Sequence, residues 1–239
     1  MEQWGPDQVM NLIKQLEPIR DQAVQDKDSV TAMYSSFDPR KDARVTAFSK
    51  MINVFNSVQL ALTFVSKHLL DLNWWKVIAR EAISVSDART YVKEFMSFFK
   101  IGFVQFLFST TESSLRLFLR ALDPSACRGG MASFKSVYDC LFRSKLSACP
   151  HEGVQLLDLF RLVRNTIHNN GVYFHPNGQD ATVSWRGTLY EFKQSVPVDF
   201  VTWQFFLEVS NAVRPLMYTV VTDTNLRAIA DEITDPFAN

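Results

Sequence analysis

The chain has 239 residues, of which 47% are hydrophobic and 21% are charged, and this balance excludes an intrinsically disordered protein. Its 25 Lys and Arg residues equal its 25 Asp and Glu residues, so the formal net charge is zero. Extended, non-specific binding to nucleic acid is therefore not expected, because it normally requires a basic excess. Only eight glycines and nine prolines interrupt the apolar patterns, which favours helices over short strands.

The cysteines and the most apolar run indicate which cellular compartment we expect for the protein. Cys127, Cys140 and Cys149 are odd in number and lack metal-ligand spacing. The N-terminus shows no secretory signal, so we expect reduced thiols and a cytoplasmic protein. The run Ile101 to Phe108 is too short to cross a bilayer, and we expect no membrane association. The pattern indicates neither a metal nor another cofactor.

Apolar residues at three- and four-residue spacing predict two long helices near the N-terminus. The first begins near Pro6 and runs to about Lys27, with Pro18 marking a kink or a break. The second covers about residues 43–72, and a short helix follows at Trp74–Arg80. We expect these helices, residues 6–80, to pack on the rest of a single domain that covers residues 1–239.

The longest predicted helix covers about residues 87–122, and apolar residues occupy nearly every side of its middle third. A helix of this kind belongs at the centre of a bundle or at a subunit interface. Glu112 precedes Arg116 by four residues, which is the spacing of an ion pair on one helical face. Further helices are predicted at residues 133–146 and from about Val154.

Beyond residue 171 the apolar period changes from 3.6 residues to two, which is typical of strands. The predicted elements there are strands at Val172–His175, Thr182–Trp185 and Thr188–Phe192, and helices at Phe200–Val221 and Asn225–Thr234. No repeat or linker divides the chain. We therefore expect a mainly α fold, a helical bundle with a small inserted β-meander.

The helix that begins near Val154 ends in the densest polar cluster of the chain. At about 100° per residue, an apolar stripe runs along it, formed by Leu156, Phe160, Val163 and Ile167. Arg164 lies at the edge of this stripe, Arg161 and His168 lie together one step further round, and Asn165 flanks them. Two guanidinium groups beside an imidazole can bind a phosphate and move a proton, and cleavage of RNA by its own 2′-hydroxyl requires both. No metal is needed for this chemistry.

The same residues also have a purely structural explanation. Arginines near the C-terminus of a helix bind its last carbonyl groups or pair with acids. His168 and Asn169 would then only finish the helix before Gly171. His175, on the strand that follows, either folds back toward the cluster as a second acid or base or lies exposed. The sequence pattern leaves these alternatives open.

Leu159 and Leu162 point away from the apolar stripe of this helix, which therefore has apolar surface in two directions. Such a helix is expected to pack against its own bundle on one side and against a partner on the other. We accordingly predict a homodimer.

The segment Arg164-Asn165-Thr166-Ile167-His168-Asn169-Asn170-Gly171 resembles the signature of the HEPN superfamily (higher eukaryotes and prokaryotes nucleotide-binding domain). That signature is an arginine, usually followed by a polar residue, then four to six residues and a histidine. The context is also similar, with a long helix before the motif, a strand excursion after it and a long closing helix. The resemblance covers about residues 87–221. It implies an all-α bundle and, in active members, a metal-independent endoribonuclease whose arginine and histidine meet between two subunits.

Three alignments of this motif are open. Arg164 is followed by an asparagine, as expected, but only three residues separate it from His168. Arg161 has six residues before His168, but a leucine follows it. In the third alignment Asn169 stands where the histidine belongs, and such a domain could not perform acid–base chemistry.

The resemblance implies a metal-independent RNase, acting as a toxin or as an effector of bacterial phage defence. The expected site consists of His168 as acid and base, Arg161 and Arg164 as phosphate ligands, Asn165 as their orienting group, and Asn169 and His175 as further binding residues. Expected partners are RNA or a nucleotide, a second copy, and an antitoxin or other protein. A second hypothesis is a non-catalytic HEPN-like module that binds a nucleotide, an RNA or a protein. A third is an unrelated helical assembly scaffold.

Overall fold

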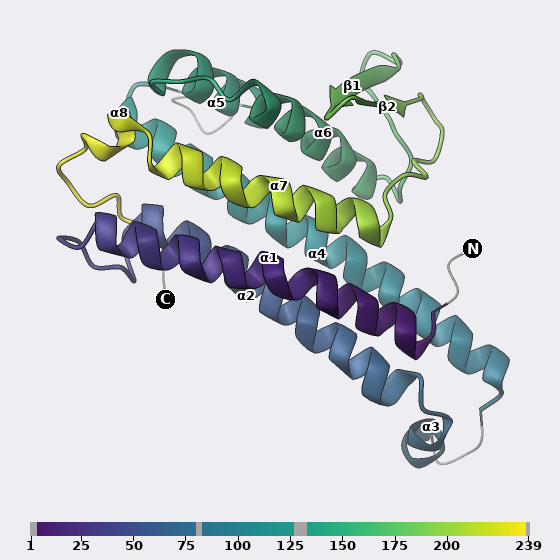
Figure 1. The fold of residues 1–239 in the computed structure, drawn as a ribbon. Coiled ribbons are helices and arrows are strands. Elements are labelled where there is room, and N and C mark those ends of the chain that lie inside the picture. The colour runs from purple at the N-terminus through teal and green to yellow at the C-terminus, as the bar shows by residue number, and fades with distance from the viewer. Residues whose placement is uncertain (1–3, 80–82, 127–132, 238–239) are drawn as a thin grey trace.

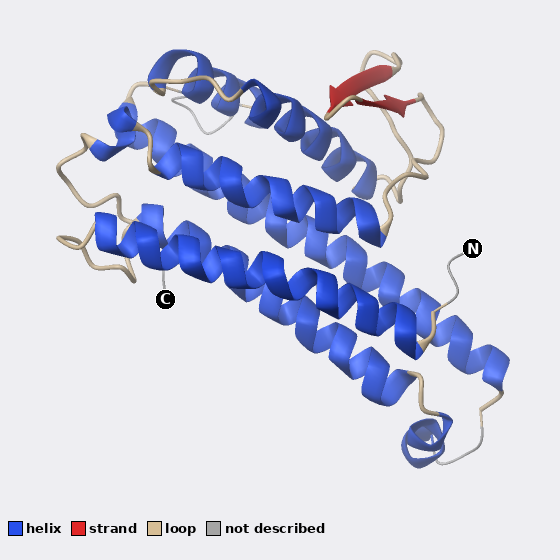
Figure 2. Cartoon of the chain, viewed as in Figure 1, coloured by secondary structure: helices blue, strands red, loops and turns tan. Residues whose placement is uncertain are grey.

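The computed structural model describes residues 4–79, 83–126 and 133–237. In chain order its elements are α1 (Pro6–Met33), α2 (Ala43–Phe64), a π-helical turn (Val65–Leu69), α3 (Leu72–Ala79), α4 (Val85–Leu122), α5 (Phe134–Cys140), a second π-helical turn (Leu141–Lys145), α6 (His151–Ile167), β1 (Ala181–Trp185), β2 (Thr188–Phe192), α7 (Trp203–Val221) and α8 (Thr224–Arg227). The molecule is a bundle of helices with one small sheet beside it, as Figures 1 and 2 show. This confirms the predicted fold class.

Helices α1 and α2 form an antiparallel pair along one side of the bundle (Figure 1). Helix α1 extends beyond its predicted end at Lys27, and Pro18 lies inside it without ending it. Its buried stripe begins at Val9 and ends at Val30, so one face of the helix stays on the core throughout. A single cluster of buried apolar side chains joins this pair to the other helices.

A buried ion pair ties the start of α2 to the C-terminal segment. Arg44 and Asp42 are both fully buried, with Nε–Oδ1 and Nη2–Oδ2 distances of 2.8 and 2.5 Å. The remaining guanidinium N–H groups donate to the carbonyl oxygens of Leu226, Ile229 and Asp231. The guanidinium carbon also lies 4.1 Å from the centre of the Tyr34 ring. Each nitrogen of this arginine therefore has a partner within the chain.

Helix α4 is the central helix, in contact with α2, α5, α6 and α7. Ser84 caps its first turn by accepting a hydrogen bond from the Asp87 N–H at 3.0 Å. The predicted ion pair between Glu112 and Arg116 is present, at 2.5 Å. Not every side of its middle third is covered, however, since Phe98 is 74% exposed.

Three predicted helices end earlier than the apolar pattern indicates. The predicted helix 43–72 passes into the first π-helical turn after Phe64, and the helix 133–146 into the second after Cys140. The predicted helix Asn225–Thr234 stops at Arg227, because the residues after it run alongside the start of α2. There the Ile233 carbonyl accepts from the N–H of Ala43 at 2.7 Å. The short helix predicted at Trp74–Arg80 is α3, and Arg80 lies outside the described residues.

The predicted β-meander is a two-stranded hairpin. Strands β1 and β2 pair antiparallel around a tight turn in which Arg186 and Gly187 both have positive φ angles, 50° and 78°. The predicted strand Val172–His175 forms only an isolated bridge, from Val172 to Pro197. This segment cannot extend the sheet because its backbone pairs with the loop after β2, where the N–H of Tyr173 donates to the Val196 carbonyl.

Both apolar faces of α6 are covered within the chain. Helix α6 contacts α4, α5, α7 and β1, and both Leu159 and Leu162 are buried. Gly153 allows close packing against α7, because a Cβ there would lie 2.4 Å from Cδ1 of Leu216. The two-faced pattern of this helix is thus explained without a partner, and it no longer supports a homodimer. The homodimer itself stays a prediction.

Candidate functional site

The polar cluster of the sequence lies where α6 ends. His168 follows the last helical residue, and Asn170 and Gly171 take left-handed φ angles of 54° and 84°. The N–H of Gly171 donates back to the Thr166 carbonyl at 2.9 Å, which closes the helix. Gly171 suits this turn because glycine adopts positive φ without strain. The turn leaves the side chains of His168 and Asn169 exposed.

Four of the predicted residues, Arg164, Asn165, His168 and Asn169, form what we call the helix-end cluster. The Arg164 Nη1 lies 3.5 Å from the Asn165 Oδ1, and the Asn169 side-chain amide donates to the Asn165 carbonyl at 3.2 Å. The Arg164 guanidinium lies 5.5 Å from the ring centre of Phe108 on α4. Its Nε is buried and has no hydrogen-bond partner in the described part of the chain. The cluster thus combines a cation that lies against α4 with an exposed imidazole one helical turn further along the chain.

Arg161 and His175 lie in a different place, a pocket of about 400 Å³ beside β1 that we call the hairpin pocket. It is lined by Lys135, Asp158, Arg161, Leu162, Tyr173, His175, Ala181, Thr182, Val183 and Ser184. Neither Arg164 nor His168 lines it. The structure therefore divides the predicted site residues between two locations, although His175 does fold back toward α6.

Asp158 is the centre of the polar contacts in the hairpin pocket. Its Oδ1 accepts from the Tyr138 hydroxyl at 2.6 Å and from Lys135 Nζ at 3.2 Å, and Arg161 Nη2 lies 3.7 Å away. Burial and then the hydrogen bond to Asp158 raise the pKa of Tyr138, which stays protonated. The three-residue step from Asp158 to Arg161 is visible in the sequence. The contribution of α5 is not, because it depends on which helix packs against α6.

His175 is held by the loops around it. Its backbone N–H donates to the Gln194 side-chain oxygen at 2.8 Å, and its Nδ1 accepts from the N–H of Asn177 at 3.2 Å. Accepting at Nδ1 places the proton of a neutral imidazole on Nε2, which can then donate a hydrogen bond. His175 is half-buried, and the centres of the His175 and Tyr173 rings lie 6.4 Å apart.

The described residues contain no group of three or more His, Cys, Asp or Glu side chains that could hold a metal ion. Cys140 and Cys149 are half-buried free thiols, and Cys127 lies outside the described residues. Among the described helices, none combines the length and the apolar character needed to cross a bilayer.

A scan against known protein families, a search of curated proteins and a search of solved structures each found no match. The resemblance to the HEPN superfamily therefore rests on the motif and its context alone.

Proposed function

We propose that this chain is a HEPN-like domain that binds RNA at the helix-end cluster and cleaves it without a metal ion. The observation that carries the proposal is the combination at one helix end of an exposed imidazole, His168, and a guanidinium one turn before it, Arg164. The guanidinium of Arg164 supports it further, because this side chain is only partly buried and a guanidinium binds phosphate oxygens.

In the proposed reaction His168 removes the proton from a ribose 2′-hydroxyl. The 2′-oxygen then forms a bond to the adjacent phosphorus, and the bond from phosphorus to the 5′-oxygen breaks. Arg164 offsets the negative charge that builds up on the phosphate oxygens. The departing 5′-oxygen takes a proton from water or from the imidazole of a second copy. The products are a 2′,3′-cyclic phosphate and a 5′-hydroxyl.

Cleavage assays in buffer with EDTA test this proposal. The wild-type chain should cut labelled single-stranded or hairpin RNA, and His168→Ala should reduce the rate at least about a hundredfold, as expected for loss of an acid–base group. His151→Ala is the matched control, since His151 is also exposed and lies at the opposite end of α6. If the wild type leaves both RNAs intact at high concentration, the enzyme proposal fails.

A non-catalytic RNA-binding module is the second candidate. It is favoured by the contacts of Arg164, which is held against Phe108 and Asn165, and by the asparagine at position 169 in the third alignment of the motif. Such a module would bind RNA in fluorescence anisotropy without cutting it. Arg164→Ala would weaken that binding, and His168→Ala would change it little. We propose that either form acts in the cytoplasm, under the control of an antitoxin or another protein.

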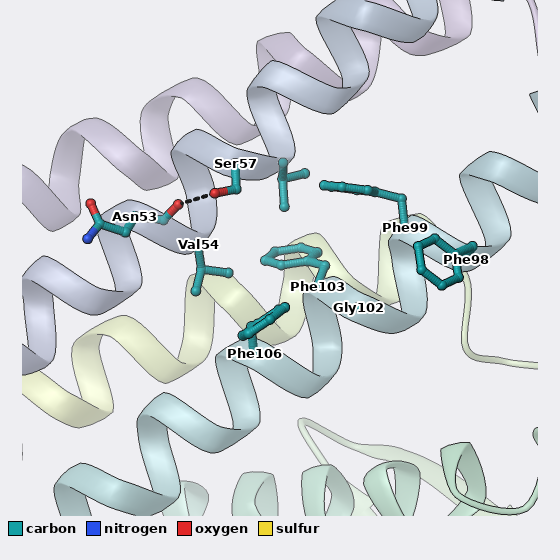
Figure 3. A pocket seen from close by; sticks show the side chains of 9 residues that line it. Asn53, Val54, Ser57, Phe98, Phe99, Gly102, Phe103 and Phe106 are labelled. Atoms are coloured by element: carbon teal, nitrogen blue, oxygen red, sulfur yellow. Dashed lines mark hydrogen bonds between the residues drawn. The ribbon is translucent and has the colours of Figure 1, made fainter. Parts of the chain in front are cut away.

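We also propose a homodimer, formed by the outward face of α4 rather than by α6. Phe98 and Phe106 are 74% and 68% exposed and flank an apolar pocket of about 370 Å³ between α2 and α4 (Figure 3). Gly102 lies midway between them, and a Cβ there would meet nothing within 4 Å. A two-fold axis at Gly102 would set Phe98 of an antiparallel copy against Phe106, as self-complementary packing requires.

Light scattering tests this dimer. The wild type should have the mass of two chains at tens of micromolar, and Phe98→Glu should have the mass of one. Leu60→Glu, at another exposed apolar residue that does not line the pocket, is the control and should remain a dimer. A monomeric wild type would contradict the proposal.

A further inference from the structure

The hairpin pocket is a built cavity that the proposed RNA chemistry does not use. Four segments supply its polar lining: α5 supplies Lys135, α6 supplies Asp158 and Arg161, and the segment after α6 supplies Tyr173 and His175, while β1 closes it with Thr182 and Ser184. Its volume of about 400 Å³ lies within the range of small-molecule sites, roughly 300–1,000 Å³.

Two buried hydrogen-bond donors in the lining of this pocket lack partners. Tyr173 is 1% exposed, and its hydroxyl has no hydrogen-bond partner among the residues that the structure describes. The buried Nε of Arg161 likewise has none there. Buried donors are almost always paired, because leaving one unpaired costs free energy. A ligand that brings acceptor oxygens into the pocket would satisfy both.

The charges of the lining favour an anion as that ligand. The carboxylate of Asp158 already accepts from Tyr138 and Lys135 and pairs with Arg161. The lining itself carries two cations, Lys135 and Arg161, and one carboxylate, and His175 offers a further donor at Nε2. Lys135 also pairs with Asp139, which lies outside the lining, at 3.2 Å, so Arg161 is the cation left to bind the anion. A planar guanidinium, a phenol and an imidazole N–H together match the several oxygens of a phosphate group.

We propose that the hairpin pocket binds the phosphate group of a small molecule, either inorganic phosphate or a phosphate monoester such as a mononucleotide. Arg161 binds two of the phosphate oxygens, and the Tyr173 hydroxyl and the His175 Nε2–H bind the others. This site stands apart from the helix-end cluster, so it does not depend on the proposed ribonuclease activity.

Titration calorimetry on the full chain tests the site, with inorganic phosphate, AMP and adenosine as three separate probes. The wild type should bind AMP and not adenosine. Affinity for inorganic phosphate equal to that for AMP would identify free phosphate as the ligand, and weaker affinity would identify the monoester. Absence of binding of both phosphate and AMP at millimolar concentration would overturn the proposal.

Tyr173→Phe separates binding from a structural role. It removes only the unpartnered hydroxyl, so the variant should keep the stability of the wild type but bind the phosphate probe about five- to tenfold more weakly. Tyr190→Phe, also at a hairpin-region tyrosine but outside the pocket, should bind as the wild type does. Unchanged affinity in Tyr173→Phe would refute the assignment, and so would a marked loss of its stability. Tyr173→Phe should still cleave RNA at the wild-type rate, which keeps this test distinct from that of the ribonuclease.

Discussion

The arginines at the start of α2 and at the end of α6 lie in opposite environments. Arg44 is fully buried, and all three of its guanidinium nitrogens donate to groups within the chain. Arg161 and Arg164 each keep a buried Nε that has no hydrogen-bond partner in the described ranges. Arg161 Nη2 lies 3.7 Å from Asp158 Oδ1, and Arg164 Nη1 lies 3.5 Å from Asn165 Oδ1. Arg44 therefore has a structural role: with Asp42 it connects the start of α2 to the C-terminal segment, and we call this connection the α2 joint. In Arg161 and Arg164, the described part of the chain leaves the Nε without an acceptor, and our proposals assign each of these arginines to a phosphate.

The carboxylates near these arginines follow the same contrast. Asp235 is buried beside the Asp42–Arg44 joint, and its Oδ2 accepts from Lys50 Nζ at 2.5 Å and from the Thr46 hydroxyl at 2.6 Å. Asp158 lines the hairpin pocket together with two of its partners, Lys135 and Arg161. Polar groups at the α2 joint thus serve the connection between distant segments, whereas those on α6 border space that a ligand can enter.

Replacing Arg44 should have the largest effect on stability. Arg44→Ala leaves Asp42 buried without its partner, and we expect the free energy of unfolding to fall by about 3–5 kcal/mol in urea titrations. Arg40→Ala is the control. Arg40 forms an exposed ion pair with Asp38, so its replacement should change the free energy of unfolding little. Equal losses in the two variants would remove the contrast between a buried joint and a surface pair.

Asp235→Asn should have an intermediate effect that depends on pH. Burial alone would raise the pKa of Asp235, but the hydrogen bonds from Lys50 and Thr46 outweigh it and lower the pKa below its ordinary value of 3.8. The carboxylate therefore stabilises the fold above that value, and this contribution disappears as the pH falls through the lowered pKa. We expect the variant to lose about 1–3 kcal/mol near neutral pH. Urea titrations across pH should show the difference from wild type shrinking below about pH 4; a constant difference would contradict this account.

Of these three variants, Arg164→Ala should have the smallest effect on stability, but it should weaken RNA binding. Its main contact within the chain is with the Phe108 ring, which is worth about 0.5–1 kcal/mol. Loss of one phosphate contact should weaken RNA binding and reduce the slope of log affinity against log salt by about 0.7. Fluorescence anisotropy over a range of salt concentrations measures this slope. A large loss of stability with unchanged RNA affinity would show that Arg164 is a structural arginine like Arg44.

Local patterns in the sequence predicted much of the fold. The stripes of α1, α4 and α7 repeat at the helical period, and the ion pair of Glu112 with Arg116 depends only on a four-residue step. The turn at Arg186 and Gly187 also follows from adjacent residues. In the candidate site, the grouping of Arg164, Asn165 and His168 at one helix end has the same local origin.

The features that the sequence did not predict depend on packing between distant segments. The C-terminal residues leave the helical conformation because their backbone pairs with Lys41 and Ala43. Arg161 pairs with Asp158 in the hairpin pocket, although its position on α6 allowed it to join His168. Which side chains share a helical face is a property of the chain's own 3.6-residue period, and the sequence alone therefore determined it. Which partner each face meets depends on how the helices and the hairpin assemble. Only the tertiary structure therefore decided that the polar side chains of α6 fall into two separate groups.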